Sequence, residues 1–520
     1  MSIQTPGPRL IAGVSDYPSD TIPALGVLLD ELAEKGVRYC LWKSNIRLRA
    51  ALAGETDLDL LIDRDQGPLF REILGRHRLK PLMPHRASAH PGMEHFLGMD
   101  GASGRLFHLH VHYQLVLGEQ YVKNYRLPME SQVLSSVRFV DGVPVPLAAV
   151  ELSILAVRAL LKYRGRDGVK DVLGIRSPGI PEGIQNEIAW LLSQTTVAEV
   201  RAILEASGGP VPKDVVSQLL ETITRSPRSG YTFLLLRSRL RRAMRPFRRR
   251  SRPGATIEYW RTKRRRRRLR RRSLQVGMTP FAGGLTIALV GADGSGKSTV
   301  ADALARWLSW KLEVRVKYLG SNMPSPQGDL LYFAFRALRR VHRAVSKSLG
   351  SGSRVVRWIG SMRDFTLALH CLAIGRDRVR RYRTGQSDVQ AGRVVIFDRF
   401  PLETLSSQSG HRALDGPRIS RAFGESTGPV KRALAGAEER IYKCFLLPDY
   451  LVVLDVSPEV SADRKPDHSL EILREKSRAA IELALLAEMR YGSAGMVKVD
   501  ANLPLPHVLH EIKRRIWDVL

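Results

Sequence analysis

The residues best suited to chemistry form the segment GADGSGKS at residues 291–298. An apolar run, 285–290, precedes it, and residues with helical spacing follow it. A glycine-rich loop between a strand and a helix turns backbone N–H groups toward phosphate oxygens, and the helix adds its positive dipole end. The Lys297 ammonium can reach β- and γ-phosphates, and the Ser298 hydroxyl can ligate Mg²⁺. The segment predicts a site for ATP and Mg²⁺, formed by Gly291, Ala292, Asp293, Gly294, Ser295, Gly296, Lys297, Ser298 and Thr299.

Two further segments place charged residues after apolar strands. Asp398 ends the apolar run 394–397, where it can hold Mg²⁺, and Arg399 would then lie beside the phosphates. Arg464 lies in the basic stretch after the run 451–456, and it can place its guanidinium on the transferring phosphoryl group. The alternatives are a capping acid with a surface arginine in the first segment, and a solvated charged loop in the second.

Alternating strands and helices are predicted around these segments. The expected strands are 285–290, 314–319, 394–397, 451–456 and 496–499, and the longest helical stretches are 329–349 and 354–382. Short apolar strands that alternate with helices indicate a parallel sheet with helices on both faces, and ligands bind beyond the carboxyl ends of its strands. The predicted fold class is therefore α/β.

In this order, the loop, the Asp-Arg pair and the basic stretch resemble the thymidylate kinase family of nucleoside monophosphate kinases, over residues from about 285 to 520. The resemblance implies a P-loop NTPase fold and an enzyme that transfers the γ-phosphoryl group of Mg-ATP to a nucleotide-like acceptor. It implies catalytic roles for Lys297, Asp398, Arg399 and Arg464, and Mg²⁺ held by Ser298 and Asp398. It also implies acceptor contacts from Asp293, Arg376, Arg378, Thr404 and Gln408.

Three positions near the acceptor depart from the family pattern. Val290 stands where the family has glutamate, Ser407 stands where it has an aromatic residue, and Phe400 lacks the usual hydroxyl. The acceptor is accordingly left open between a nucleotide and another phosphorylatable molecule. A second class of function also stays open, namely an ATP-binding regulatory or scaffold protein that uses the phosphate site as a sensor.

Near the N-terminus, Asp57 and Asp59 are two residues apart around the expected strand 58–62, so both carboxylates point to one face. Such a pair can hold a divalent metal against a nucleoside triphosphate. With a helix and a short strand that ends in a small polar turn before it, this pattern resembles the nucleotidyltransferase superfamily over residues from about 24 to 115, although Lys43 and Ser44 stand where that superfamily has Gly-Ser. The resemblance implies an α/β domain with Asp57 and Asp59 as metal ligands.

The third carboxylate of that superfamily is replaced by a histidine here. His110 stands at its position, on an expected strand that also carries His108 and His112 on the same face. Histidine can bind metal, whereas alternating histidines can also form a satisfied polar cluster. Whether this region is catalytic stays open.

Four regions are predicted, because a chain of 520 residues is too long for one core. They are a nucleotidyltransferase-like domain at 1–146, a helical accessory region at 147–236, an Arg-rich linker at 237–280, and a thymidylate kinase-like P-loop domain at 281–520.

The formal net charge of +31 is concentrated in one segment, since 19 of the 82 Lys and Arg residues lie between 237 and 273 with a single acid, Glu258. The stretch from Arg237 to Arg272 can act as a linker, contact nucleic acid through its phosphates, or dock on an anionic membrane. Apolar residues at 233–236 and Phe247 favour the membrane for its first half.

The remaining features concern the compartment and partners. Cys40, Cys371 and Cys444 are far apart, which favours a reducing compartment. No apolar run is long enough to cross a bilayer, and the first residues lack a signal-peptide core. The expected location is the cytoplasm, with peripheral membrane association as an option. A nucleotide-like small molecule and a second copy of the chain, in a homodimer, are the other expected partners.

Overall fold

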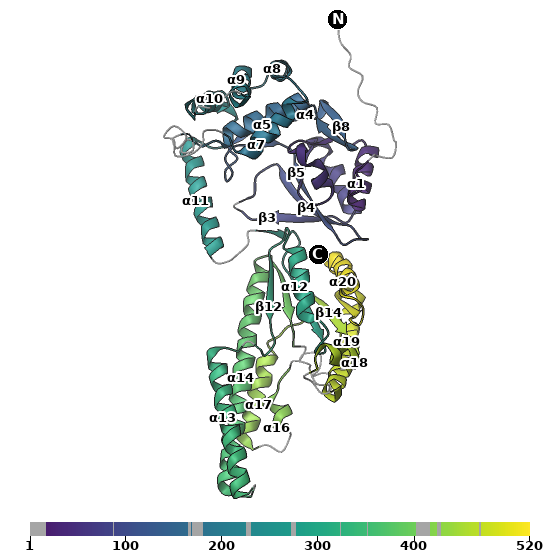
Figure 1. The fold of residues 1–520 in the computed structure, drawn as a ribbon, viewed down its shortest axis with the longest axis vertical. Coiled ribbons are helices and arrows are strands. Elements are labelled where there is room, and N and C mark those ends of the chain that lie inside the picture. The colour runs from purple at the N-terminus through teal and green to yellow at the C-terminus, as the bar shows by residue number, and fades with distance from the viewer. Residues whose placement is uncertain are drawn as a thin grey trace. The chain divides into compact units, whose positions relative to one another are not determined.

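The computed structural model describes residues 17–86, 88–164, 168, 180–224, 230–271, 277–322, 324–350, 352–401, 416–423, 428–466 and 470–520. The chain divides into two compact units, Met1–Phe281 (unit 1) and Ala282–Leu520 (unit 2), each with its own core (Figure 1). Among the described helices, none combines the length and the apolar character that a membrane span requires.

Unit 1 is built on a six-stranded sheet. Its strand order is β1 (Tyr39–Leu41), β2 (Leu58–Ile62), β5 (Leu106–His112), β4 (Met93–Met99), β3 (Lys80–Pro84) and β10 (Met278–Pro280). β2 and β5 run parallel to each other, and the other neighbours are antiparallel. Two hairpins are formed by β6 (Leu115–Leu117) with β7 (Tyr125–Leu127), and by β8 (Val137–Val140) with β9 (Val143–Pro146).

The two faces of this sheet differ in character. On one face, α1 (Pro23–Glu34), α2 (Leu48–Leu52) and α3 (Gly67–Arg76) share an apolar core with Leu60, Leu109 and Val111 of β2 and β5. On the other face, Asp59 stands opposite His110 across β2 and β5, and His95 stands opposite His110 across β4 and β5. Residues alternate between the two faces of a strand, so the acidic and histidine side chains gather on the second face.

The helical part of unit 1 packs around α5 (Ala148–Lys162), which is buried along almost its whole length. The helices that share its core are α4 (Glu130–Ser135), α7 (Glu182–Leu192), α8 (Val197–Ala206), α9 (Lys213–Thr224) and α10 (Gly230–Ala243). A capping box begins α8, in which the Thr196 hydroxyl accepts from the Glu199 N–H and the Glu199 carboxylate accepts from the Thr196 N–H.

The described residues of the segment expected as a linker, 237–271 and 277–280, lie in unit 1. α10 buries four apolar residues at helical spacing in the core around α5, namely Phe233, Leu236, Leu240 and Met244. On its flank, Arg241 Nε donates a hydrogen bond to the Tyr125 hydroxyl at 2.8 Å, and further along the chain β10 pairs with β3. Phe233 and Leu236, which belong to the apolar stretch expected to favour a membrane, therefore pack against protein, whereas Leu235 is 47% exposed.

The second half of the basic segment forms α11 (Arg252–Arg271). Its Arg266 guanidinium lies 5.2 Å from the centroid of the Tyr121 ring and donates a hydrogen bond to the Ser88 hydroxyl. Contacts of this kind fix one side of the helix to unit 1. Other arginines of α11 are exposed, among them Arg264, Arg265, Arg267 and Arg268.

Unit 2 is built on a parallel sheet of five strands. The order is β12 (Val314–Tyr318), β13 (Val394–Asp398), β11 (Leu285–Gly291), β14 (Tyr450–Asp455) and β15 (Met496–Asp500). α12 (Lys297–Leu308) and α20 (Leu505–Val519) cover one face, and α14 (Arg354–Gln390) and α19 (Leu470–Gly495) cover the other. The predicted α/β class with a parallel sheet between two helical layers is confirmed for this unit.

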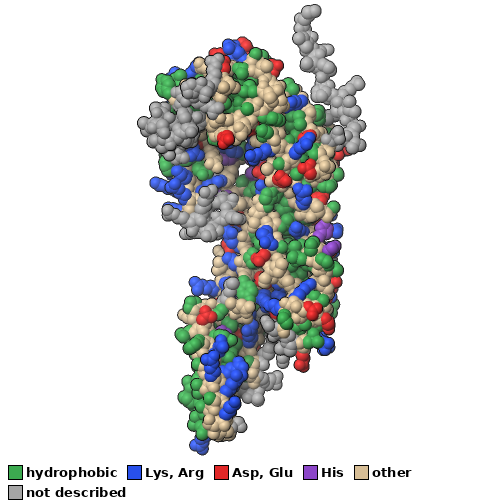
Figure 2. Space-filling view, viewed as in Figure 1, with side chains coloured by type: hydrophobic (Ala, Val, Ile, Leu, Met, Phe, Trp, Pro, Cys, Tyr) green, Lys and Arg blue, Asp and Glu red, His purple; other side chains and the backbone are tan. Residues whose placement is uncertain are grey.

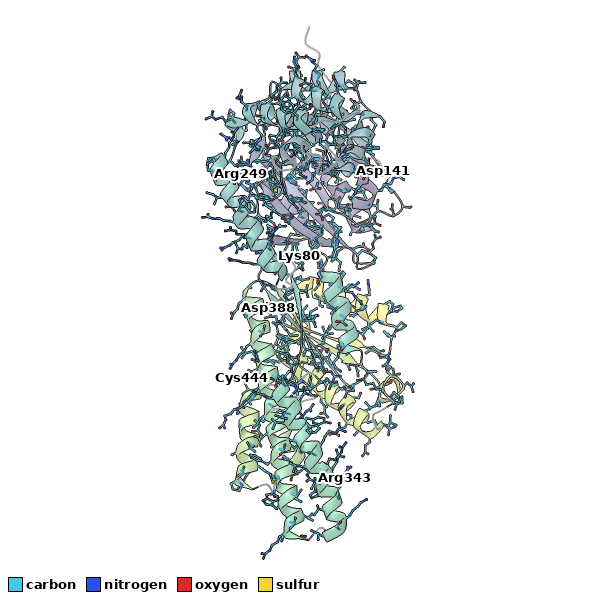
Figure 3. All side chains as sticks on the ribbon, turned by 60° about the vertical axis from the view of Figure 1, so that its left-hand side comes forward. Lys80, Asp141, Arg249, Arg343, Asp388 and Cys444 are labelled. Atoms are coloured by element: carbon cyan, nitrogen blue, oxygen red, sulfur yellow. The ribbon has the colours of Figure 1, made fainter. Side chains whose placement is uncertain are left out.

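A pair of long helices extends from this sheet. α13 (Pro326–Leu349) lies along α14, and α16 (Ile419–Phe423) and α17 (Pro429–Tyr442) also belong to this region. Figure 3 shows Arg343 on the outer part of the pair and Asp388 near the sheet end of α14. Phe333 is 72% exposed and Trp358 is 64% exposed on the pair. Figure 2 shows hydrophobic and basic side chains together on this part of the surface.

Candidate functional site

The loop after β11 has the backbone geometry that its glycines predict. Gly294 and Gly296 have φ angles of 82° and 84°, in the left-handed region that favours glycine. A Cβ atom at Gly294 would lie 2.9 Å from Ser461 Oγ, and one at Gly291 would lie 2.4 Å from the Leu454 carbonyl oxygen. Side chains at these two positions would push the loop away from α18 (Pro458–Arg464) and from β14. The loop therefore keeps a bare backbone at the carboxyl edge of the sheet.

Lys297 begins α12 and is buried within this loop. Its Nζ atom donates hydrogen bonds to the carbonyl oxygens of Gly291 at 2.8 Å and Ala292 at 2.6 Å. The ammonium is thus enclosed by the same loop whose N–H groups can face phosphate oxygens. The structure places the predicted residues from Gly291 to Thr299 together at this edge.

Ser298 and Asp398 meet beside the loop. The Ser298 hydroxyl donates a hydrogen bond to Asp398 Oδ2 at 2.6 Å. Asp398 ends β13, is 3% exposed, and its Oδ1 atom has no hydrogen-bond partner among the described residues. The Ser298 hydroxyl and the Asp398 carboxylate, whose Oδ1 atom is buried and unsatisfied, form a donor set that fits Mg²⁺. The two predicted metal ligands of unit 2, Ser298 and Asp398, therefore lie next to each other.

Asp293 is held between two cations at the same edge. Arg399 Nη1 donates to Asp293 Oδ1 at 3.0 Å, and Lys476 Nζ lies 2.5 Å from Asp293 Oδ2. Burial alone would raise the pKa of the Asp293 carboxyl, but the hydrogen bond and charge of Lys476, with the charges of Arg399 and Lys297, hold it well below its ordinary value. Asp293 is therefore a fixed anion. Arg399 occupies a left-handed conformation, with φ of 60°, directly after β13.

Arg464 ends the short helix α18, whereas a charged loop was expected there. Its Nη1 atom donates to the carbonyl oxygens of Ala501 at 3.0 Å and Gly294 at 3.3 Å. Ser461, one turn earlier, donates from its hydroxyl to the Asp293 carbonyl oxygen. Arg464 thus ties the phosphate loop to the segment that follows β15.

The two candidate acceptor arginines point in different directions. Positions two apart on a helix lie about 200° apart around its axis, so one side chain faces inward when the other faces out. Arg376 is exposed, whereas Arg378 is fully buried and donates from Nη1 to the Tyr442 hydroxyl at 2.5 Å. The other predicted acceptor residues, Thr404 and Gln408, lie outside the described residues.

Two cations of this site were not predicted. Lys476 comes from α19, and no motif in the sequence marks it. Arg381 comes from α14, and its Nη1 atom donates to the Tyr318 carbonyl oxygen at 2.8 Å. Tyr318 pairs with Asp398 across β12 and β13, so Arg381 reaches the edge of the sheet that carries the predicted Mg²⁺ ligands. Its spacing of three residues from Arg378 is the signal that could have indicated it.

A second cluster lies in unit 1, where Asp57 and Asp59 line a cavity of about 420 Å³. Lys43, Ser44 and Asn45 line it from the turn after β1. Lys43 Nζ lies 2.7 Å from Asp59 Oδ1. Burial would raise the pKa of Asp59, but the charge of Lys43 and the neighbouring His110 and His112 hold it well below its ordinary value.

Four histidines lie beside these two carboxylates. His110 Nδ1 is 2.8 Å and His112 Nε2 is 3.6 Å from Asp59 Oδ1, and His108 Nδ1 is 2.9 Å from Asp57 Oδ1. The His95 ring stacks on the His110 ring with centroids 4.6 Å apart. Burial lowers the pKa of His110 and His112, and burial lowers that of His95 to about 2. These imidazoles are therefore neutral at ordinary pH.

Unit 2 has the geometry of a P-loop unit, with a parallel sheet, a lysine buried within the loop and a hydrogen-bonded serine–aspartate pair. Comparison with known proteins finds similarity to ATP-binding proteins and to a kinase over less than half of the chain. No family model matches it. The uncharacterized ATP-binding protein YghR of Escherichia coli K12 is 26% identical over 238 residues, which are 44% of this chain and 86% of that protein. YghS of the same organism is 26% identical over 246 residues, 45% of this chain and 93% of that protein.

A thymidylate kinase of Leifsonia xyli subsp. xyli is 27% identical over 239 residues, which are 45% of this chain and 94% of that enzyme. Among solved structures, deoxyadenosine kinase from M. mycoides with bound dATP shares 13% identity, covers 45% of this chain and 99% of its own, and has a TM-score of 0.28. Each of these matches spans less than half of the chain.

Proposed function

We propose that unit 2 is an ATP-dependent phosphotransferase of the nucleoside monophosphate kinase type, with a nucleotide-like acceptor. The observation that carries this proposal is the hydrogen bond of 2.6 Å between Ser298 and Asp398, next to the buried Lys297 ammonium. A phosphate-binding cation and two oxygen ligands for Mg²⁺ then lie within one loop edge. The similarity to two ATP-binding proteins and a thymidylate kinase supports the same class.

The residues of the loop would act by position and charge. The N–H groups of the loop and of the first turn of α12 would bind the phosphates, and Lys297 would exchange its contacts with the Gly291 and Ala292 carbonyls for phosphate oxygens. Ser298 and Asp398 would hold Mg²⁺, which would supply neutralisation of phosphate charge. No covalent intermediate with the protein is required, because phosphoryl transfer depends mainly on alignment and electrostatics.

On the acceptor side, Asp293 would accept a hydrogen bond from an acceptor hydroxyl while Lys476 and Arg399 keep it ionised. Arg378 and Arg381 lie on the part of α14 that faces the unit, so we propose them as the arginines nearest to an acceptor phosphate. Arg376 is exposed and faces a separate groove with Cys444. Arg399 and Arg464 remain proposed catalytic arginines, and Thr404 and Gln408 remain proposed acceptor contacts.

The test is a product assay with the full chain, γ-labelled ATP, Mg²⁺ and a panel of nucleoside monophosphates. Transfer of label to any member supports the proposal and identifies the acceptor. Saturable ATP binding without transfer to any nucleoside monophosphate would contradict it and favour the alternative, an ATP-binding regulatory or scaffold protein.

For unit 1 we propose a nucleotidyltransferase-like domain, supported by the position of Asp57 and Asp59 on the wall of the cavity beside Lys43. We further propose that the exposed arginines of α11 contact a polyanion through its phosphates, since they project from a helix whose other side is fixed to unit 1. Binding of vesicles with anionic lipid, and of duplex DNA, measured against salt concentration, tests this second point. Binding that is insensitive to salt would contradict it.

A further inference from the structure

The carboxylates of unit 1 do not fit the metal that its resemblance to nucleotidyltransferases implies. Mg²⁺ prefers an octahedral set of oxygen ligands. Here Asp57 contacts His108, and Asp59 is surrounded by Lys43, His110 and His112. Imidazole nitrogens are poor ligands for Mg²⁺ and good ligands for zinc, cobalt and nickel ions. The donor set therefore points to a different class of cation.

We propose that Asp59, His110 and His112 form a binding site for a divalent cation of the zinc class, at the wall of the cavity in unit 1. This goes beyond the phosphotransferase proposed for unit 2, and it rests on none of the residues of that site. The two proposals therefore stand or fall separately.

Strand register brings the three ligands together. β2 and β5 are parallel with Asp59 opposite His110, and His112 lies two residues further along the same face. One ligand atom from each residue can be chosen so that all three lie within 4.8 Å of one another. Atoms bound at about 2.1 Å to a tetrahedral zinc ion are about 3.4 Å apart. Small side-chain rotations would bring the cluster to that spacing.

His112 provides an independent indication of a missing partner. It is 1% exposed, and neither of its ring nitrogens has a hydrogen-bond partner among the described residues. Its Nε2 atom is 3.6 Å from Asp59 Oδ1, beyond hydrogen-bond distance, and its ring packs edge-on against Trp42 with centroids 5.0 Å apart. A buried polar group without a partner is costly, and a metal ion on Nε2 would satisfy it.

The ligands are also held in place by their neighbours. The His110 ring stacks on the His95 ring, at 4.6 Å between centroids, and also contacts the tilted His112 ring, at 4.3 Å. Such packing limits the rotation of the imidazole, as the outer contacts of metal ligands commonly do. Three protein ligands leave a fourth position of a tetrahedral ion open, and the cavity that Asp59 lines is the space next to it.

Lys43 is a built-in competitor for this cation. Its ammonium lies 2.7 Å from Asp59 Oδ1 and 5.0 Å from the centroid of the Trp42 ring. An ammonium and a divalent cation cannot both neutralise the same carboxylate oxygen at contact distance. Metal binding would therefore displace Lys43 toward the cavity, where it could meet an anionic ligand of the metal. Removal of the ammonium should strengthen metal binding rather than weaken it.

The experiment is equilibrium dialysis of the chelator-treated full chain against Zn²⁺ alone, in a buffer with excess Mg²⁺ to occupy hard oxygen sites. We expect about one tightly bound Zn²⁺ per chain, with the affinity reduced about 100-fold or more in His110→Ala and Asp59→Asn. We expect Lys43→Gln to raise the affinity about tenfold. His77→Ala removes a histidine of the same unit that is paired with Glu31, outside the cluster, and should leave the affinity unchanged.

A readout that does not depend on counting ions is the visible absorption of bound Co²⁺, which should appear in the unmodified chain and in His77→Ala and be lost in His110→Ala. Circular dichroism shows whether His110→Ala is folded. If that variant is unfolded, Lys43→Gln still tests the site, because the proposal expects it to raise the Zn²⁺ affinity. Absence of bound Zn²⁺, unchanged affinity in folded His110→Ala, weaker binding in Lys43→Gln, or complete displacement by Mg²⁺ would each overturn the proposal.

Discussion

Asp293 in unit 2 and Asp59 in unit 1 are both carboxylates surrounded by nitrogen atoms, but the nitrogens differ in charge. Asp293 lies between Lys476 and Arg399, which carry permanent charges. Asp59 has one ammonium, from Lys43, and two buried imidazoles whose pKa values burial lowers. Asp293 is therefore already neutralised by its two cations, and it can hold other groups in position. Asp59 retains neutral ligands beside it and can exchange its cation.

The largest effect is expected in unit 2 at Lys297, the buried ammonium of the phosphate loop. Lys297→Ala removes the ammonium inside the loop and should lower the transfer rate about 10³-fold or more. Initial rates at saturating ATP and acceptor measure this. Lys347→Ala, an exposed lysine on α13, is the matched control and should keep the full rate. A Lys297→Ala rate within tenfold of normal would contradict the proposal that this loop binds the phosphates of ATP.

Asp398→Asn tests the metal site of unit 2, whose ligands are oxygens, in contrast to the histidine-rich site of unit 1. It removes the negative charge and one of the two carboxylate oxygens, and it should lower the maximal rate about 100-fold while raising the Mg²⁺ concentration for half-maximal rate. Ser298→Ala should move both quantities in the same direction by less. Rates titrated against free Mg²⁺ measure this, and an unchanged Mg²⁺ dependence in Asp398→Asn would argue against the metal role.

Lys476→Met tests whether Asp293 binds the acceptor. The variant leaves Asp293 with Arg399, so we expect KM for the acceptor to rise about tenfold and KM for ATP to change little. Lys431→Met is the matched control, since Lys431 is paired with Asp364 at 2.9 Å on α17 and α14. An equal rise in both KM values for Lys476→Met would mean that the lysine supports the whole loop instead. A double-mutant cycle with Asp293→Asn isolates the pair.

The smallest effect concerns acid. Burial lowers the pKa of His90 to about 3, so unfolded chains bind a proton below about pH 6.5 that the folded unit 1 does not. Stability of unit 1 should therefore fall as the pH drops from about 6.5 toward 3. The full shift corresponds to about 2 kcal/mol at pH 5, and we expect about 1 kcal/mol for this residue because its partly exposed ring is screened by solvent. The pKa of Asp293 is lowered, so its contribution is lost only as the pH falls through that low value.

Hydrogen exchange at pH 7 and pH 5 measures the two units separately. Protection in unit 1 should decrease first, and His90→Gln should reduce that decrease. Equal loss of protection in both units would contradict the proposed difference in charge.

The parts of unit 2 that sequence reasoning found are those encoded by neighbouring residues. The loop from Gly291 to Ser298 is contiguous, and its strand and helix follow directly from local spacing. Lys476 could not be found in this way, because it is a single lysine on a long helix that reaches Asp293 only after folding. Choosing between Arg376 and Arg378 needs the rotation of α14 relative to its neighbours, which local sequence does not supply.

The basic segment illustrates a different limit. The apolar stripe on α10 was visible, but the sequence does not state what covers it, and the structure covers it with the core around α5. The pairing of β10 with β3 joins residues almost two hundred positions apart, as Met278 stands opposite Pro84. The histidine cluster was partly visible on β5, yet its partner Asp59 and its stacked neighbour His95 depend on strand register.

The length of α14 has a mechanical consequence. Its 37 residues form a rod of about 55 Å, and about 35 Å of it separates Arg378 from the first residue, Arg354. A tilt of about 5° at Arg378 would move the end at Arg354 by about 3 Å, because the displacement grows with the length of a rigid helix. The exposed Trp358 side chain travels with that end. A ligand that tilted α14 at Arg378 would therefore also move residues that lie far from the sheet.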